Sequence, residues 1–76
     1  MESPPTPEEA FREALRIAGS QAALAAIVGK RQAAISKRVN GSCQARPEEV
    51  LPIERATGVP CHYLRPDIYP REIIHA

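Results

Sequence analysis

Apolar and polar residues follow one another along this chain with the period of short α-helices. Between residues 7 and 18 the apolar residues recur every three or four positions, which makes an inward stripe of Phe11, Ala14, Leu15 and Ala18. The opposite face carries the charged residues Arg12, Glu13 and Arg16. Thr6, Pro7 and Glu9 form a capping box with a first-turn proline, and Gly19 supplies a left-handed C-terminal turn. The pattern predicts a first helix over residues 7–18.

Two further helices follow directly. Ser20 is an N-cap, and the strong helix formers over residues 21–28 end at Gly29. A third helix is predicted from residue 31 or 32 to residue 39. We expect it to end at Asn40 and Gly41, because both residue types tolerate a positive φ.

A fourth helix, predicted over residues 47–57, contains a proline. Pro47 suits the first helical position, and the two carboxylates after it suit the positive end of the helix dipole. Pro52 removes one backbone hydrogen bond, so this helix should bend or split. A last short helix over residues 60–65 is stopped by Pro66.

These elements predict an all-α protein, a compact bundle of about five short helices. Seventy-six residues suit one domain. Residues 1–6, rich in proline and short polar side chains, are expected to be a disordered lead-in. Residues 7–70 should form the domain, and residues 71–76 a C-terminal tail.

Charge is separated along the chain, although the net charge is only +1. No acidic residue occurs from Ala14 to Pro47, and this basic block contains six cations, namely Arg16, Lys30, Arg31, Lys37, Arg38 and Arg46. Such a surface attracts a polyanion, because each cation set against a phosphate releases a condensed counterion. The alternative is an ordinary solvated surface, which explains Arg16 and Arg46 as well as contact does.

Within the basic block, the second and third predicted helices have the pattern of a helix-turn-helix. Leu24, Val28 and Ile35 are placed to fill the wedge between two helices, Ala25 is small where they cross, and Gly29 permits a sharp turn. This spacing resembles the helix-turn-helix of the Cro and phage-repressor type, a lambda-repressor-like fold. A plain helical hairpin is the alternative.

The resemblance extends beyond the motif. Residues 52–58 and 63–69 look like the C-terminal half of the YdaS family, Cro-like prophage regulators also described as antitoxins. The matching parts cover roughly residues 10–70. This resemblance implies a DNA-binding domain that represses phage or toxin-antitoxin promoters. The chain departs from the family where a Ser or Thr usually caps the recognition helix, because Lys30 and Arg31 stand there.

The helical period indicates which residues of the recognition helix, about residues 31–39, face DNA. With Gln32 at 0°, Ser36 lies at about 40°, Ala33 at about 100°, Lys37 at about 140° and Arg38, turned toward the protein, at about 240°. Gln can pair with adenine, Ala can touch a thymine methyl, and Lys can reach guanine or a phosphate. We expect base contacts from an outward row made of Gln32, Ala33, Ser36 and Lys37. An ordinary polar helix face is the alternative.

Five residues are candidates for phosphate contacts. Ser20 and Gln21 begin the second helix, where free amides favour an anion, although Ser20 also serves as a cap. Lys30 and Arg31 precede the recognition helix, where a phosphate could replace the missing cap. The family resemblance adds Asn40, just past that helix.

We expect no enzyme activity. No Ser-His-Asp or Cys-His motif is present, and a chain this small offers no deep pocket. The carboxylates fall on predicted outer helical turns, at Glu8, Glu9, Glu48, Glu49 and Glu54. The histidines and cysteines lack paired ligand spacing, so neither a metal nor a cofactor is expected. Cys43 and Cys61 should be free and dispensable thiols.

Location and partners follow from the same features. No apolar run approaches the roughly 18 residues of a membrane span and no signal peptide is evident, so we expect a cytoplasmic protein with no membrane partner. The expected partner is double-stranded operator DNA, bound by a homodimer. The alternative is an antitoxin that mainly binds a toxin, or another phage-encoded protein, through the apolar residues 68–74.

Overall fold

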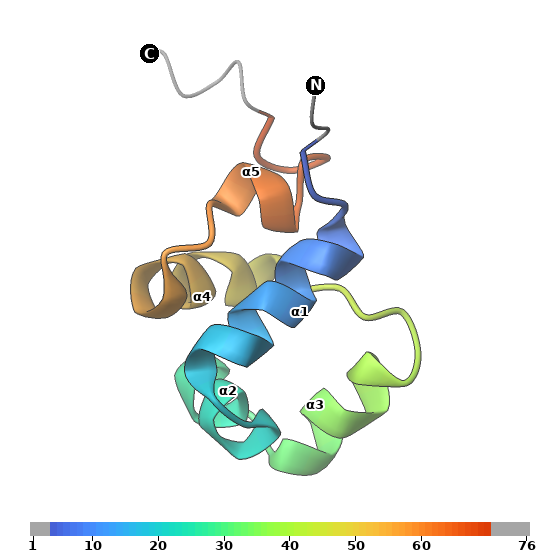
Figure 1. Ribbon diagram of the computed structural model, residues 1–76, viewed down its shortest axis with the longest axis vertical. Helices are drawn as coiled ribbons and strands as arrows, with labels where there is room; N and C mark the ends of the chain where they lie inside the picture. The colour runs from blue at the N-terminus through green and yellow to red at the C-terminus, as the bar shows by residue number, and fades with distance from the viewer. Residues whose placement is uncertain (1–3, 71–76) are drawn as a thin grey trace.

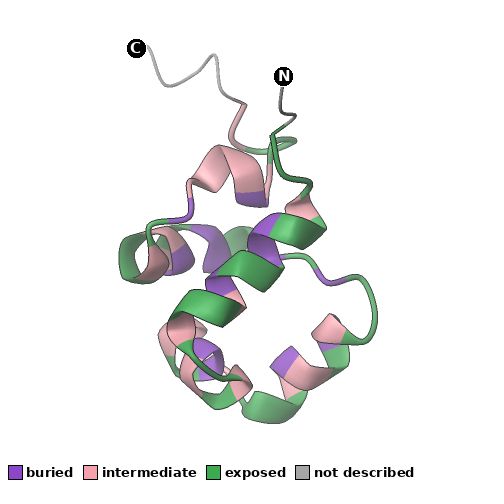
Figure 2. Ribbon diagram, viewed as in Figure 1, coloured by how far each residue is buried: buried purple, intermediate pink, exposed green. Residues whose placement is uncertain are grey.

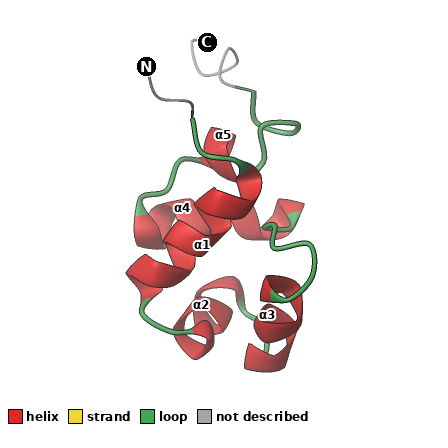
Figure 3. Cartoon of the chain, turned by 45° about the vertical axis from the view of Figure 1, so that its right-hand side comes forward, coloured by secondary structure: helices red, strands yellow, loops and turns green. Residues whose placement is uncertain are grey.

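The structure of the chain, a computed structural model, describes residues 4–70. Within these residues every regular element is helical (Figures 1 and 3): α1 (Pro7–Ala18), α2 (Gln21–Val28), α3 (Gln32–Val39), the 3₁₀ turn η1 (Pro47–Glu49), α4 (Val50–Thr57) and α5 (Cys61–Leu64). The prediction of an all-α protein with five short helices is confirmed. The predicted tail, with Ile73 and Ile74, lies outside the described residues.

Local capping explains where the first two helices begin and end. Thr6 Oγ1 accepts a hydrogen bond from the Glu9 N–H at 3.1 Å, and Glu9 Oε1 accepts one from the Thr6 N–H at 2.9 Å. Ser20 Oγ accepts from the Ala23 N–H at 3.0 Å. Gly29 closes α2 with φ +70°. The predicted bounds of α1 and α2 are confirmed.

α3 ends at Val39 as predicted, but the expected positive φ is absent from both Asn40 and Gly41. Asn40 continues the right-handed conformation, and its Nδ2 donates to the Ser36 carbonyl oxygen at 3.1 Å. Gly41 has little room beside it, since a Cβ there would make a tight contact of 3.3 Å with the Lys37 carbonyl oxygen. The left-handed residue is Cys43, with φ 53°.

The predicted fourth helix is split, and the break precedes Pro52. The segment begins as the 3₁₀ turn η1 and becomes α-helical only at Val50. Pro52 is therefore the third residue of α4. Its missing N–H falls in the first turn, where a helix offers that group no acceptor. The break thus removes the cost of a proline inside the helix.

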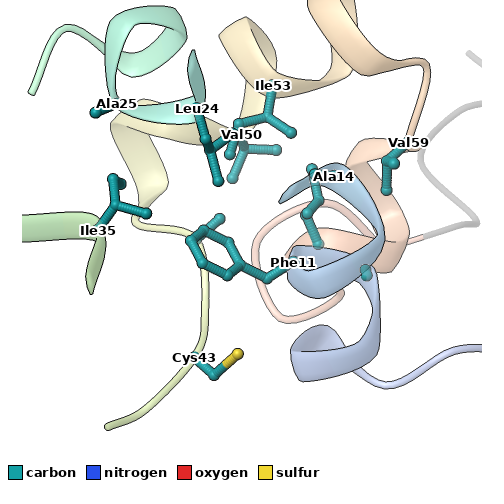
Figure 4. Packing of buried hydrophobic residues seen from close by; sticks show 12 residues of the cluster. Phe11, Ala14, Leu24, Ala25, Ile35, Cys43, Val50, Ile53 and Val59 are labelled. Carbon is teal, nitrogen blue, oxygen red and sulfur yellow. The ribbon is translucent and has the colours of Figure 1, made fainter. Parts of the chain in front are cut away.

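All the described helices contribute to one core. α2 and α3 pack together most extensively and form one end of the molecule, α5 lies at the other end, and α1 connects them (Figure 1). Figure 4 shows the Phe11 ring between Ile35 and Ala14, which come from α3 and α1. The buried apolar residues are Ala10, Phe11, Ala14, Leu24, Ala25, Ile35, Cys43, Ala45, Val50, Ile53, Val59 and Leu64. None of the described helices is both long and apolar enough to traverse a lipid bilayer.

Candidate nucleic-acid interface

The two faces of α3 differ in burial. Gln32, Ala33 and Lys37 are exposed and Ser36 is half-buried, whereas Ile35 and Arg38 on the other side are buried (Figure 2). The helical period therefore separates the two faces as predicted. The outward row is on the surface, free to meet a ligand.

The start of α3 has no side-chain cap. Arg31 occupies the N-cap position, with extended backbone and no capping hydrogen bond from its side chain. This confirms the consequence expected from the missing Ser or Thr. Arg31 is exposed and takes no part in an ion pair among residues 4–70. The uncapped amides and this cation make the N-terminal end of α3 electropositive.

Two of the predicted phosphate ligands already have partners within the fold. The Ser20 hydroxyl caps α2, and the Asn40 amide group donates to a carbonyl of α3. Gln21 is half-buried at the start of α2. Ser20 and Asn40 can each make a further hydrogen bond, but both side chains are already engaged within the fold.

Lys30 is held against η1. Its Nζ lies 2.8 Å from Glu48 Oε2 and 2.8 Å from Glu49 Oε2, and its side chain is only 28% exposed. Hydrogen bonds to Glu48 and then to Glu49 raise the pKa of Lys30. The structure therefore does not place Lys30 with the outward row as a free cation, because two carboxylates already neutralise it.

Glu49 is fully buried, so the prediction that it lies on an outer helical turn is wrong. Its Oε1 accepts from the Arg46 N–H at 2.9 Å and from the Arg38 guanidinium. Arg38 is only 8% exposed and lies over the Phe11 ring, with 5.8 Å from Cζ to the ring centroid. A buried guanidinium needs a counter-charge, which explains why the carboxylate turns inward.

The surroundings of Glu49 favour its charged form. Burial raises its pKa, but hydrogen bonds from the Arg46 N–H, Lys30 and Arg38 outweigh burial, and the pKa of Glu49 is lowered. We call Lys30, Arg38, Glu48 and Glu49 the Glu49 cluster. The cluster ties α3 and the turn before it to η1.

Ion pairs within the fold hold half of the six cations of the basic block: Arg16, with Glu13, and Lys30 and Arg38, in the Glu49 cluster. The cations without an ion pair in the described part of the chain are Arg31, Lys37 and Arg46. The sequence block therefore overstates the charge available to a ligand. Lys37 lies on α3 and Arg31 directly precedes it, whereas Arg46 lies at the start of η1.

The two thiols differ in their surroundings, although both are free, as predicted. Cys43 is 1% exposed, and Arg12 Nε donates to its Sγ at 3.3 Å. Burial and then Glu54 raise the pKa of Cys61, which is only half-buried. Cys43 is thus a core residue, which its loop position did not indicate. Within residues 4–70 no three His, Cys, Asp or Glu side chains are arranged to hold a metal ion.

The protein is a small all-α domain whose second and third helices pack across a tight glycine turn. The model of the family described as "Bacterial toxin YdaS" matches residues 11–73, which is most of the chain. The chain belongs to the YdaS family, and the resemblance found in the sequence is confirmed. No curated protein and no solved structure matches it.

Proposed function

We propose that this protein is a sequence-specific regulator that binds double-stranded DNA, a Cro-like repressor of a prophage or toxin-antitoxin promoter. The observation that carries the proposal is the outward row of α3, which lies on the surface and is bordered by Arg31, a cation with no ion pair among residues 4–70. An α-helix with its side chains is about 10–12 Å in diameter, which fits a major groove about 12 Å wide.

The residues of this surface divide into base contacts and phosphate contacts. Gln32, Ala33, Ser36 and Lys37 meet base edges, where Gln favours adenine and Lys favours guanine or a nearby phosphate. Arg31 and the uncapped amides of α3 meet a backbone phosphate, and Ser20, Gln21 and Asn40 are secondary candidates. Lys30 acts mainly by fixing the turn, since both of its ion pairs lie within the fold.

Two copies bind one operator, because helix-turn-helix proteins read two-fold sites with half-sites roughly 34 Å apart. The proposed action is binding alone, without catalysis or a cofactor. Stoichiometric titration should give two chains per operator. A single half-site bound as tightly as the full operator would contradict this assembly.

A second function is favoured by one observation, the family description as a bacterial toxin. In this alternative the protein belongs to a toxin-antitoxin pair and acts by binding a protein. Residues 68–70 are the described part of the apolar segment expected to dock; Ile68 is 38% exposed, whereas Tyr69 packs against the core. A partner that still co-purifies after alanine replaces Gln32, Ser36 and Lys37 would favour the alternative.

The test of DNA binding separates residues that recognise bases from residues that contact phosphates. An operator is first selected from a random duplex pool, and binding is then titrated at several salt concentrations on the operator and on a scrambled duplex. Gln32→Ala should cost about 1–3 kcal/mol on the operator and flatten the preference at one position per half-site. Arg31→Ala should weaken binding to both duplexes alike and lower the salt slope by about one unit per protomer.

The matched control is Arg55→Ala. Arg55 is exposed on α4 and has no ion pair among residues 4–70, so it tests the loss of one surface charge far from α3 in sequence. It should leave the salt slope unchanged. If Gln32→Ala affected neither duplex while Arg31→Ala erased the discrimination between them, the proposed placement of α3 would be wrong.

A further inference from the structure

A second cationic feature lies beyond the outward row, where α3 faces the loop that follows it. A hollow of about 290 Å³ is lined by Ala34, Lys37, Arg38, Ser42 and Arg46. An adjoining hollow of about 260 Å³ shares Arg38, Ser42 and Arg46 with it and adds Arg65. We call the first of them the cationic hollow. Among the described residues, no acidic side chain lines either hollow.

Two cations of the cationic hollow remain available for a ligand. Arg38 is paired with Glu49, and Arg65 of the adjoining hollow is paired with Asp67 and donates to the Ala45 carbonyl oxygen at 3.1 Å. Lys37 and Arg46 have no ion pair within residues 4–70. Their like charges face one concavity, so an anion seated there is attracted by both.

We infer that the cationic hollow binds a phosphate group of the DNA backbone. A volume of about 290 Å³ is roughly ten times the 30 Å³ that one water occupies in the liquid, enough for a partly hydrated phosphodiester. Arg46 and Lys37 supply the charge, and the exposed Ser42 hydroxyl supplies a neutral donor. This inference rests on the proposed function and assigns Arg46 and Ser42, which the sequence left unassigned, to the same interface.

The position of the hollow favours a duplex backbone over a small phosphate compound. Lys37 belongs both to the outward row and to the hollow, so the two surfaces are continuous. Arg31 stands before the first turn of α3, whereas the two available cations of the hollow lie on its last turn, at Lys37, and beyond it, at Arg46. With α3 in a major groove, cations near both of its ends can each approach a phosphate of the backbone that borders the groove.

The test compares Arg46→Ala and Ser42→Ala with the control Arg55→Ala. Arg46→Ala keeps the hydrogen bond from residue 46 to Glu49, because the donor is the main-chain N–H and not the side chain. It should weaken binding to operator and scrambled duplex by the same factor and lower the salt slope by about 0.9 per protomer. Ser42→Ala should weaken binding less and leave the salt slope unchanged. In ethylation interference, Arg46→Ala should lose the signal at one backbone phosphate per half-site, whereas Arg55→Ala should keep the wild-type pattern.

The outcomes separate this inference from the proposed function. If the wild type binds its operator but Arg46→Ala keeps the salt slope and interference pattern of Arg55→Ala, the inference is overturned and the proposed function stands. Binding of inorganic phosphate that perturbs the Arg46 and Ser42 amides, with no effect of Arg46→Ala on duplex binding, would assign the hollow to a small ligand and also overturn it. A wild type that binds no duplex would overturn both.

Discussion

Glu49→Gln should destabilise the fold far more than the neighbouring change Glu48→Gln. The Glu49 side chain is 0% exposed, and its partner Arg38 has a side chain 7% exposed. Removing the charge leaves a guanidinium buried without a counter-charge, which typically costs about 3–5 kcal/mol. A domain of this size is stable by about 4–11 kcal/mol, so the variant should lose a large part of its stability.

Glu48→Gln is the matched control, because Glu48 pairs with the same Lys30 and has a side chain 61% exposed. Exposed ion pairs contribute little, so its urea midpoint should stay close to that of the wild type. The measurement is urea unfolding at pH 7, followed by helical circular dichroism. Equal midpoints for the two variants would refute the assignment of Glu49 as the buried counter-charge.

Acid titration tests the same reasoning independently. The pKa of Glu49 is lowered in the fold, so its stabilisation is complete above its ordinary pKa and is lost as the pH falls through the lower folded-state value. Wild-type stability should therefore fall as the pH drops below about 4.5, and Glu49→Gln should show a shallower fall. Identical slopes would contradict a charged Glu49 in the core.

Two further predictions concern the thiols and the first cap. At pH 8 in native buffer, iodoacetamide should modify Cys61 slowly, because the pKa of this thiol is raised. Cys43 should react only after unfolding, because it is buried. Equal labelling of both thiols by mass spectrometry would contradict the burial of Cys43. Thr6→Ala removes the side-chain hydrogen bond that Thr6 accepts in the capping box and should cost about 1 kcal/mol of stability. By calorimetry the Tm should fall by about 4–8 °C, with the bounds of the later helices unchanged. An unchanged Tm would show that the cap contributes nothing.

Helix bounds could be predicted because their signals are local. Thr6 and Glu9 lie three residues apart, and Ser20 caps the helix that directly follows it. The left-handed Gly29 likewise ends the helix directly before it. Each of these signals is complete within one turn of the chain, so it can be read without knowledge of the tertiary structure.

The Glu49 cluster could not be predicted, because its partners meet only in the folded chain. Glu49 follows a proline at a predicted helix start, where an exposed carboxylate is the usual finding. One signal did exist: the helical period turned Arg38 toward the protein, and a buried guanidinium requires an acid. The period also separated the exposed row of α3 from its buried face, but contacts with bases leave no trace in an unbound chain.

The two faces of α3 have a consequence for how such proteins diverge. Ile35 and Arg38 anchor the helix in the core, whereas Gln32, Ala33 and Lys37 stand outside it. Substitutions on the outer face therefore carry little penalty in folding, and under the proposed function the preferred operator can change while the scaffold stays constant. The same separation makes α3 a candidate for grafting: a new set of outer residues, placed over an unchanged inner face, should give a folded protein with a different target.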